Sequence, residues 1–171
     1  MKHKKTLIAI IILSVLLIAF LIQNYNSMNK YHEKVNNEYS NLSIIIDKKL
    51  DLTKNVIKEL NTMKYKSNKL DKLKKATKKL EDAYNISTKN KYNKQVDDYL
   101  EKIENDIKKN NYKTTDKYNV LLSQISTQND KSNKQVEKYN KRVNEYNNKI
   151  SHIPNNITSK LFRMKTETVY S

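Results

Sequence analysis

One unbroken heptad stripe near the carboxyl end constrains the fold of this 171-residue chain more than any other feature. Over nearly five heptads its members are spaced alternately four and three residues apart, so they share one face of a helix. The members are Tyr118, Leu122, Ile125, Asn129, Ser132, Val136, Tyr139, Val143, Tyr146 and Ile150. The stripe predicts a helix of about 55 Å. Thr114 or Thr115 would cap its start, and Pro154 would end it.

Three earlier segments show the same helical spacing of apolar residues. Residues 24–65 carry a wide stripe and predict a first long helix that continues directly from the segment before it; residues 70–83 and 92–107 predict two shorter helices. Polar connectors are expected at residues 65–69, 86–91 and 109–114. No segment alternates with period two for long enough to form a strand. An all-α, antiparallel long-helix bundle of about four helices would bury all the stripes, and a set of loosely associated coiled-coil helices is the alternative.

The amino-terminal segment has a different composition from the rest of the chain. Residues 6–22 form an uncharged apolar run, TLIAIIILSVLLIAFLI, that would extend about 25 Å as a helix and can span a bilayer. A cleaved signal peptide is the alternative, but this run is longer than a usual signal core, and no small-residue cleavage site follows it. We therefore expect an uncleaved transmembrane anchor at residues 6–22, a cytoplasmic amino terminus at residues 1–5 and a helical bundle domain at residues 23–171.

The distribution of lysines around the anchor predicts its orientation. Lys2, Lys4 and Lys5 precede the apolar run, whereas the first positive charge after it is Lys30. Cytoplasmic flanks carry the excess of positive charge. We expect a single-pass protein of the cytoplasmic membrane with its bundle outside.

The composition excludes several classes of chemistry. The chain has no Gly and no Cys, so phosphate-binding glycine loops, nucleophile elbows, disulfides and thiolate metal sites are absent. The three histidines, His3, His32 and His152, have no metal-ligand spacing. Asp97 and Asp98 are expected on a solvent-facing helix surface, where nothing would tune them for acid–base catalysis. We expect no enzyme activity, cofactor or metal.

Two motifs resemble signatures of the LemA family. The sequence YNKRVNEYNNKI at residues 139–150, followed by Pro154, resembles the carboxyl-terminal YN-V-YN-I helix and turn of that family. The sequence KKLDLTKNVI at residues 48–57 is similar to an earlier family motif of two basic residues, Asp-Leu and Asn-Val. Tyr170 falls near the family's terminal aromatic residue. Asn129 departs from the pattern, because an acidic residue is usual there.

The resemblance implies a bacterial membrane protein with an amino-terminal anchor and a bundle of long helices. It also implies a molecular activity that is poorly defined, with some members working alongside membrane-bound zinc proteases. A membrane-bound protease or another envelope protein is therefore the expected partner class. Neither the resemblance nor the residues predict self-association.

The Tyr-Asn pairs allow a structural and a functional interpretation. In the first, Tyr139, Val143, Tyr146 and Ile150 form a buried seam, and the asparagines beside them fix the helix alignment. In the second, a partner protein binds a polar patch. The candidate residues for the structural seam and the partner patch together are Asp51, Asn55, Tyr139, Asn140, Val143, Tyr146, Asn147 and Pro154.

The chain is strongly basic, with a net charge of +16. The most positive stretch covers residues 64–79, and Lys72, Lys75 and Lys79 are its candidate contacts with an anionic surface. Nucleic acid is not expected, because the chain has only two Arg, no known binding motif and a predicted position outside the cytoplasm. The function we expect is a non-enzymatic, membrane-anchored helical scaffold of the cell envelope; the alternative is a basic surface that binds anionic lipid headgroups or wall polymers.

Overall fold

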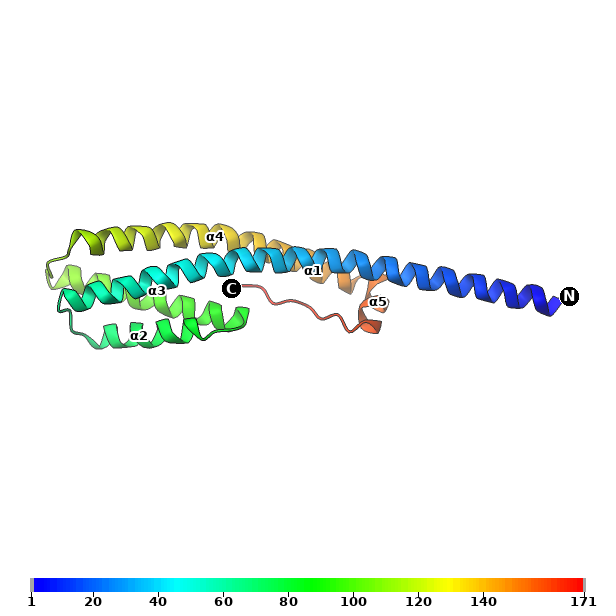
Figure 1. The fold of residues 1–171 in the computed structure, drawn as a ribbon, viewed down its shortest axis with the longest axis horizontal. Helices are drawn as coiled ribbons and strands as arrows, with labels where there is room; N and C mark the ends of the chain where they lie inside the picture. The colour runs from blue at the N-terminus through cyan, green and yellow to red at the C-terminus, as the bar shows by residue number, and fades with distance from the viewer. Residues whose placement is uncertain (1, 171) are drawn as a thin grey trace. The chain divides into compact units, whose positions relative to one another are not determined.

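The computed structural model describes residues 2–170, and all the regular structure in that part of the chain is helical (Figure 1). The helices are α1 (Lys2–Thr62), α2 (Asn68–Glu81), α3 (Ile86–Lys109), α4 (Asp116–Ser151) and α5 (Asn155–Leu161). The predicted all-α fold with an amino-terminal apolar helix is confirmed. The apolar run and the first long helix belong to one continuous helix, α1.

The chain divides into two compact units, and both α1 and α4 contribute to each. The bundle unit contains Glu38–Asn140 and Tyr170; the anchor unit contains the chain up to Asn37 and Lys141–Val169. In the bundle unit, α2 and α3 form a hairpin that packs with α1 and α4 (Figure 1). In the anchor unit, α1 and α4 are joined by α5 and by a carboxyl-terminal tail without regular structure.

Helix α1 buries a residue at every seventh position. The heptad series is Met28, Val35, Leu42, Lys49 and Val56, and each of these residues is at most 2 % exposed. A second series four residues later contributes Ile46, Thr53 and Leu60. Lys49 is therefore a charged residue at a core position of an otherwise apolar seam.

Helix α4 buries most of its predicted stripe. Tyr118, Ile125, Ser132 and the four residues of the Tyr-Asn motif, Tyr139 to Ile150, lie in the core. The structure differs at three positions of the stripe, because Leu122, Asn129 and Val136 are only half-buried, and the neighbouring Leu121 and Gln135 are buried instead of Leu122 and Val136. Gln135 can occupy the core position because its side-chain amide is paired. Its Nε2 donates to Glu38 Oε2 at 2.6 Å and to the Glu38 carbonyl oxygen at 3.1 Å.

The predicted start of α4 is confirmed, whereas the predicted start of the third helix is wrong. Thr115 caps α4, because its hydroxyl oxygen accepts from the Tyr118 N–H at 3.1 Å. Residues 86–91, predicted as a connector, are the first turns of α3. The Asn85 side chain caps that helix by accepting from the Thr88 N–H at 2.8 Å.

Three helices end in a left-handed residue although the chain has no Gly. Lys64, Asn111 and Arg163 have φ values of 57°, 52° and 55°. In each case the next residue donates its N–H to the carbonyl five residues back, as in a Schellman motif. Lys64 and Arg163 occupy a region that disfavours side chains with a Cβ, so these two turns carry backbone strain.

Candidate functional site

The asparagines of the Tyr-Asn motif bind the backbone of the carboxyl-terminal tail. In the bundle unit, Asn140 Nδ2 donates to the Tyr170 carbonyl at 2.8 Å, and Asn140 Oδ1 accepts from the Tyr170 N–H at 2.7 Å. In the anchor unit, Asn147 makes the same pair of bonds to Glu167, at 2.9 and 2.8 Å. Each asparagine therefore satisfies both backbone groups of one tail residue, as a neighbouring strand would in a sheet.

The spacing of the two asparagines matches an extended chain. Residues seven apart on a helix are separated by about 10.5 Å along its axis. Glu167 and Tyr170 are three residues apart, and an extended chain covers about 10 Å in that distance. The heptad spacing of the two asparagines thus matches the three-residue spacing of Glu167 and Tyr170.

Neighbouring side chains add contacts to the tail in the anchor unit. The Tyr146 hydroxyl donates to the Lys165 carbonyl at 2.9 Å, and burial raises the pKa of this hydroxyl. His32 Nε2 lies 3.0 Å from Glu167 Oε1, and the His32 ring packs on Tyr146 with 5.1 Å between ring centroids. The tail is therefore held to both α1 and α4 of this unit.

Tyr170 is the buried end of the tail in the bundle unit. Its hydroxyl accepts from Asn93 Nδ2 of α3 at 3.2 Å, and burial raises its pKa to about 12. Tyr139, which precedes the Asn140 clamp, is buried nearby in the same unit and packs against Tyr39 of α1 with centroids 6.3 Å apart. Tyr170 thus contacts both α3, through Asn93, and α4, through Asn140.

The structure divides the predicted polar patch. Asn140 and Asn147 contact the tail, whereas Asp51 and Asn55 line a shallow groove of the bundle unit. The other residues of that groove are Lys48, Leu52, Gln124 and Gln128. Val143 is fully buried, and Pro154 is exposed before α5. The contact between the asparagines and the tail was not predicted from the sequence. A pair of asparagines one heptad apart beside a buried seam is the signal that could have indicated it.

A buried charged pair connects α1 with α3. Lys49 is 1 % exposed, and its Nζ contacts Asp97 Oδ1, whose side chain is 38 % exposed. Burial lowers the pKa of Lys49, and Asp97 partly opposes that effect. Asn129 Nδ2 of α4 lies 3.4 Å from the same carboxylate. Asp97 was predicted on a solvent-facing helix surface; its side chain is partly exposed there and also supplies the counter-charge for a core lysine.

The acid beside Lys49 comes from α3, and Asn129 of α4 contacts the same carboxylate. Three helices of the bundle unit thus meet at one polar point that extends from the core lysine to the half-buried Asp97 and Asn129. Such a point costs desolvation energy, and it favours one alignment of the helices.

A second polar cluster connects the α1–α2 turn with α3. Asp106 accepts from Lys69 Nζ at 2.7 Å and from the Tyr65 hydroxyl at 2.6 Å. These two bonds hold the pKa of Asp106 below its usual value, while burial raises the pKa of Tyr65 to about 12. Tyr112 packs edge-on against Tyr65 at 5.4 Å.

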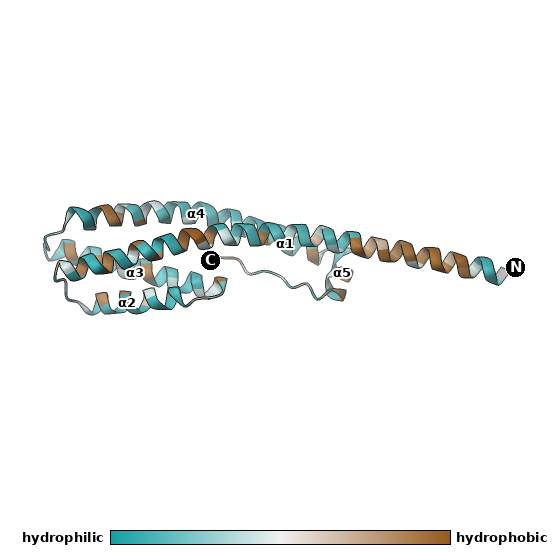
Figure 2. Cartoon of the chain, in the orientation of Figure 1, coloured by the Kyte–Doolittle hydropathy of each residue, from teal (hydrophilic) through white to brown (hydrophobic). Residues whose placement is uncertain are grey.

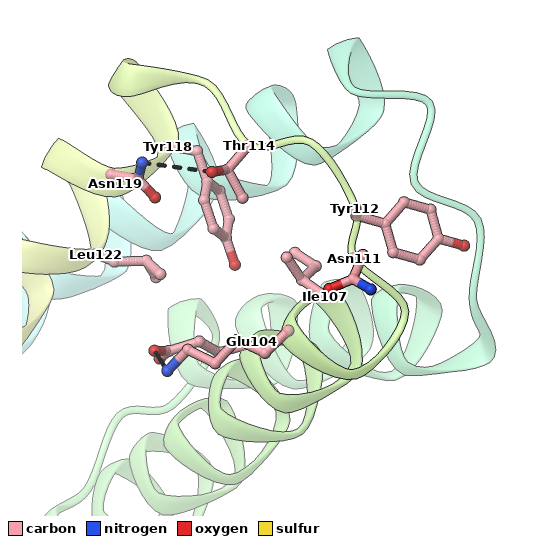
Figure 3. Close-up of a pocket in the computed structure, with 9 residues that line it drawn as sticks. Glu104, Ile107, Asn111, Tyr112, Thr114, Tyr118, Asn119 and Leu122 are labelled. Carbon is pink, nitrogen blue, oxygen red and sulfur yellow. Dashed lines mark hydrogen bonds and ion pairs between the residues drawn. The ribbon is translucent and has the colours of Figure 1, made fainter.

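A groove opens beside this cluster, between α3 and the start of α4 (Figure 3). Tyr118 and Leu122 of α4 and Ile107 of α3 form its apolar wall, and burial raises the pKa of Tyr118. The charged residues among its lining, Glu104 and Lys108, pair with each other at 2.6 Å. The groove is therefore lined by apolar side chains, polar side chains and one ion pair.

The predicted anionic-surface residues Lys72, Lys75 and Lys79 are all exposed on α2. Lys79 Nζ lies 5.7 Å from the centre of the Tyr92 ring. Within residues 2–170, no three His, Asp or Glu side chains come close enough together to hold a metal ion.

The comparisons with known proteins identify the family. The LemA family model matches residues 38–171, so it covers both clamping asparagines, the Lys49 motif and the tail. The chain belongs to the LemA family. No match was found among the curated proteins.

Proposed function

We propose that this protein is a single-pass membrane protein whose helical bundle acts as a non-enzymatic scaffold at the bacterial cell envelope. The observation that carries the proposal is the exposed apolar surface of α1 between Thr6 and Ile22. Large side chains such as Leu7, Leu13 and Leu16 are all more than half exposed there. A surface of this size is costly in water and stable in lipid, and the helix is long and apolar enough to cross a membrane.

The continuity of α1 supports a scaffold role. The helix runs from Lys2 to Thr62, and the chain contains no Gly or Pro before Pro154 that would allow a kink. The same helix provides the apolar run and then the heptad seam of the bundle unit. The apolar run and the first helix of the bundle unit therefore belong to one continuous helical segment.

The chemistry of the buried charged groups supports an interaction role rather than catalysis. Lys49 is paired with Asp97, Glu59 accepts from the Thr115 hydroxyl at 2.7 Å, and Asp106 binds Tyr65 and Lys69. Each of these pairs connects different elements of the bundle unit. The pKa shifts of Lys49, Glu59 and Asp106 therefore arise from burial and from these structural contacts. As the partner of the scaffold we propose an envelope protein, such as a membrane-bound protease.

Membrane extraction tests the anchoring directly. The full chain should stay in the membrane fraction after washing with alkaline carbonate and dissolve in detergent, whereas a variant lacking residues 6–22 should be soluble and helical. Release of the full chain by carbonate would contradict the anchor. A variant that remains bound without residues 6–22 would show that another part of the chain holds it to the membrane.

A second candidate function is supported by the lysines of α2. Lys72, Lys75 and Lys79 are exposed along one helix, where clustered positive charge attracts anionic lipids or polymers by about 1 kcal/mol per residue near the surface. We propose this binding as the alternative activity. This binding would use the surface of α2 and not the apolar run of α1.

Removing the same number of lysines from α2 and from α4 separates binding by α2 from an effect of the net charge of the chain. A triple variant with Gln at Lys72, Lys75 and Lys79 should sediment less with anionic vesicles or wall polymer at low salt. The control replaces Lys131, Lys134 and Lys138, which are exposed on α4, with Gln. Equal loss in both variants would mean that net charge alone causes the binding.

A further inference from the structure

Helix α5 has its apolar and polar faces reversed relative to a helix of a soluble domain. Its buried residues are Thr158 and Ser159, whereas Ile157 and Leu161 are 63 % and 62 % exposed. Ile153, four residues before Ile157, is 80 % exposed, and Phe162 is also exposed. Ile157 and Leu161 are four positions apart on α5 and share one exposed face, and Ile153 and Phe162 are exposed at the two ends of the helix.

Specific contacts hold α5 in this reversed orientation. Ser159 Oγ donates to the Ile150 carbonyl at the end of α4 at 3.0 Å, and to the Asn156 carbonyl at 3.0 Å. A short polar face therefore fastens the helix to α4. If α5 rotated so that Ile157 and Leu161 were buried, the hydrogen bond between Ser159 and the Ile150 carbonyl would be lost.

The position of α5 along α1 is defined by an aromatic contact. Phe162 packs against Tyr25 of α1, with 4.6 Å between ring centroids. Tyr25 lies three residues after Ile22, the end of the apolar run, which corresponds to about 4.5 Å along the helix. The headgroup region extends about 5–7 Å beyond the hydrocarbon core on each side, so this contact falls within it. Figure 2 shows α5 beside the part of α1 where the apolar run ends.

The charges around α5 suit a membrane surface. Lys160, Arg163 and Lys165 are exposed, and residues 152–166 contain no Asp or Glu. Cationic side chains with exposed apolar neighbours are typical of segments that lie in the headgroup layer of anionic membranes. An aromatic pair at the same level is typical of residues at a lipid–water interface.

We propose that α5 is an interfacial membrane-contact helix, which inserts Ile153, Ile157, Leu161 and Phe162 into the headgroup layer of the bilayer that α1 spans. Lys160 and Arg163 face the lipid phosphates. The inference rests on the proposed anchoring by residues 6–22. It adds a second contact with the membrane, which fixes the tilt and the rotation of the anchor unit on the bilayer.

The absence of Trp from the chain allows a direct test. Three single-Trp variants of the full chain, Leu161→Trp, Phe20→Trp and Tyr84→Trp, are reconstituted into vesicles of phosphatidylcholine and phosphatidylglycerol. Quenching of Trp emission by phosphatidylcholine brominated near the headgroup end of its acyl chains reports contact with lipid. Phe20 lies within the apolar run, and Tyr84 is an exposed residue of the bundle unit, between α2 and α3.

The proposal predicts that Leu161→Trp is quenched several-fold more than Tyr84→Trp and emits at shorter wavelength, as Phe20→Trp does. Quenching of Phe20→Trp alone would overturn the α5 proposal and leave the anchor in place. No quenching of either variant would overturn both. Blue-shifted emission of Leu161→Trp without quenching by brominated lipid would also overturn the proposal, because protein rather than lipid would then cover α5. Ile157→Trp repeats the measurement on the same exposed face if Leu161→Trp does not fold.

Discussion

The side-chain amide of Asn147 pairs with both backbone polar groups of Glu167: Nδ2 donates to the carbonyl at 2.9 Å, and Oδ1 accepts from the N–H at 2.8 Å. Asn140 repeats this arrangement with Tyr170 one heptad earlier on α4. The two asparagines hold the backbone of the tail, while the side chains of Glu167 and Tyr170 contact His32 and Asn93. This relationship gives the Tyr-Asn motif of the family a structural role in this chain.

We expect Asn147→Ala to loosen the tail in the anchor unit. The change removes two hydrogen bonds, each contributing about 1 kcal/mol, so the free energy of unfolding should fall by about 1–2 kcal/mol. Hydrogen exchange at the Glu167 amide should become faster. Asn144→Ala, at an exposed position on the same helix, is the control and should change the free energy of unfolding by less than about 0.5 kcal/mol. Equal exchange rates in the two variants would exclude the clamp.

The Lys49–Asp97 pair should respond asymmetrically to mutation. Asp97→Ala leaves a buried ammonium group without its counter-charge and should destabilise the chain by about 2–4 kcal/mol. Lys49→Met fills the heptad position with an apolar side chain and leaves Asp97 partly in water, so it should cost less or even stabilise. Urea melts of both variants and the double variant measure this. A larger loss for Lys49→Met than for Asp97→Ala would contradict the buried-charge interpretation.

The Asp106 cluster predicts two limbs in the pH dependence of stability. The pKa of Asp106 is lowered in the folded chain, so its contribution is present above the unfolded pKa, near 4, and is lost as the pH falls through the folded pKa. The pKa of Tyr65 is raised from 10.0 to about 12, so its contribution is present below pH 10.0 and is lost as the pH rises toward 12.

Tyr65→Phe is the variant that tests both limbs. It removes the alkaline titration and one of the bonds that lower the pKa of Asp106. Thermal melts across the pH range should show a smaller loss of stability above pH 10 than in the unmodified chain, and a weaker dependence on acid below about pH 4. Identical pH profiles for the two chains would mean that the cluster does not contribute to folding.

The left-handed helix ends should be sites of stabilisation by Gly. Lys64→Gly and Arg163→Gly relieve the Cβ clash at φ values of 57° and 55° and should raise the free energy of unfolding by up to about 1 kcal/mol each. Lys138→Gly, at an exposed position inside α4, is the control and should lower it by about 1 kcal/mol. Destabilisation by all three changes would show that these turns are not strained.

The long helices were predictable from the sequence because periodicity alone defines them. The stripe of α4, its Thr115 cap and the continuity of α1 follow from local spacing and residue type. The early start of α3 was missed because residues 86–91 are polar, and the Asn85 cap was not recognised. Helix α5 was missed because a seven-residue helix with its apolar side facing outward resembles a loop.

The tertiary contacts could not be read from the sequence. Lys49 and Asp97 are far apart along the chain, and only packing brings them together. The bonds of Asn140 and Asn147 go to backbone atoms of the tail, which leave no side-chain signature in the tail sequence. Asp51 and Asn55 lie in the motif at residues 48–57, and only packing brings them beside Gln124 and Gln128.

Cysteine accessibility in living cells tests the central claim, a bundle held outside the membrane by α1. The chain has no Cys, so Tyr84→Cys and His3→Cys each introduce a single thiol, one in the bundle unit and one before the apolar run. A membrane-impermeant maleimide added to cells stripped of outer barriers should label Tyr84→Cys at once and label His3→Cys only after permeabilisation. Immediate labelling of His3→Cys, with Tyr84→Cys protected until the membrane is opened, would contradict the account.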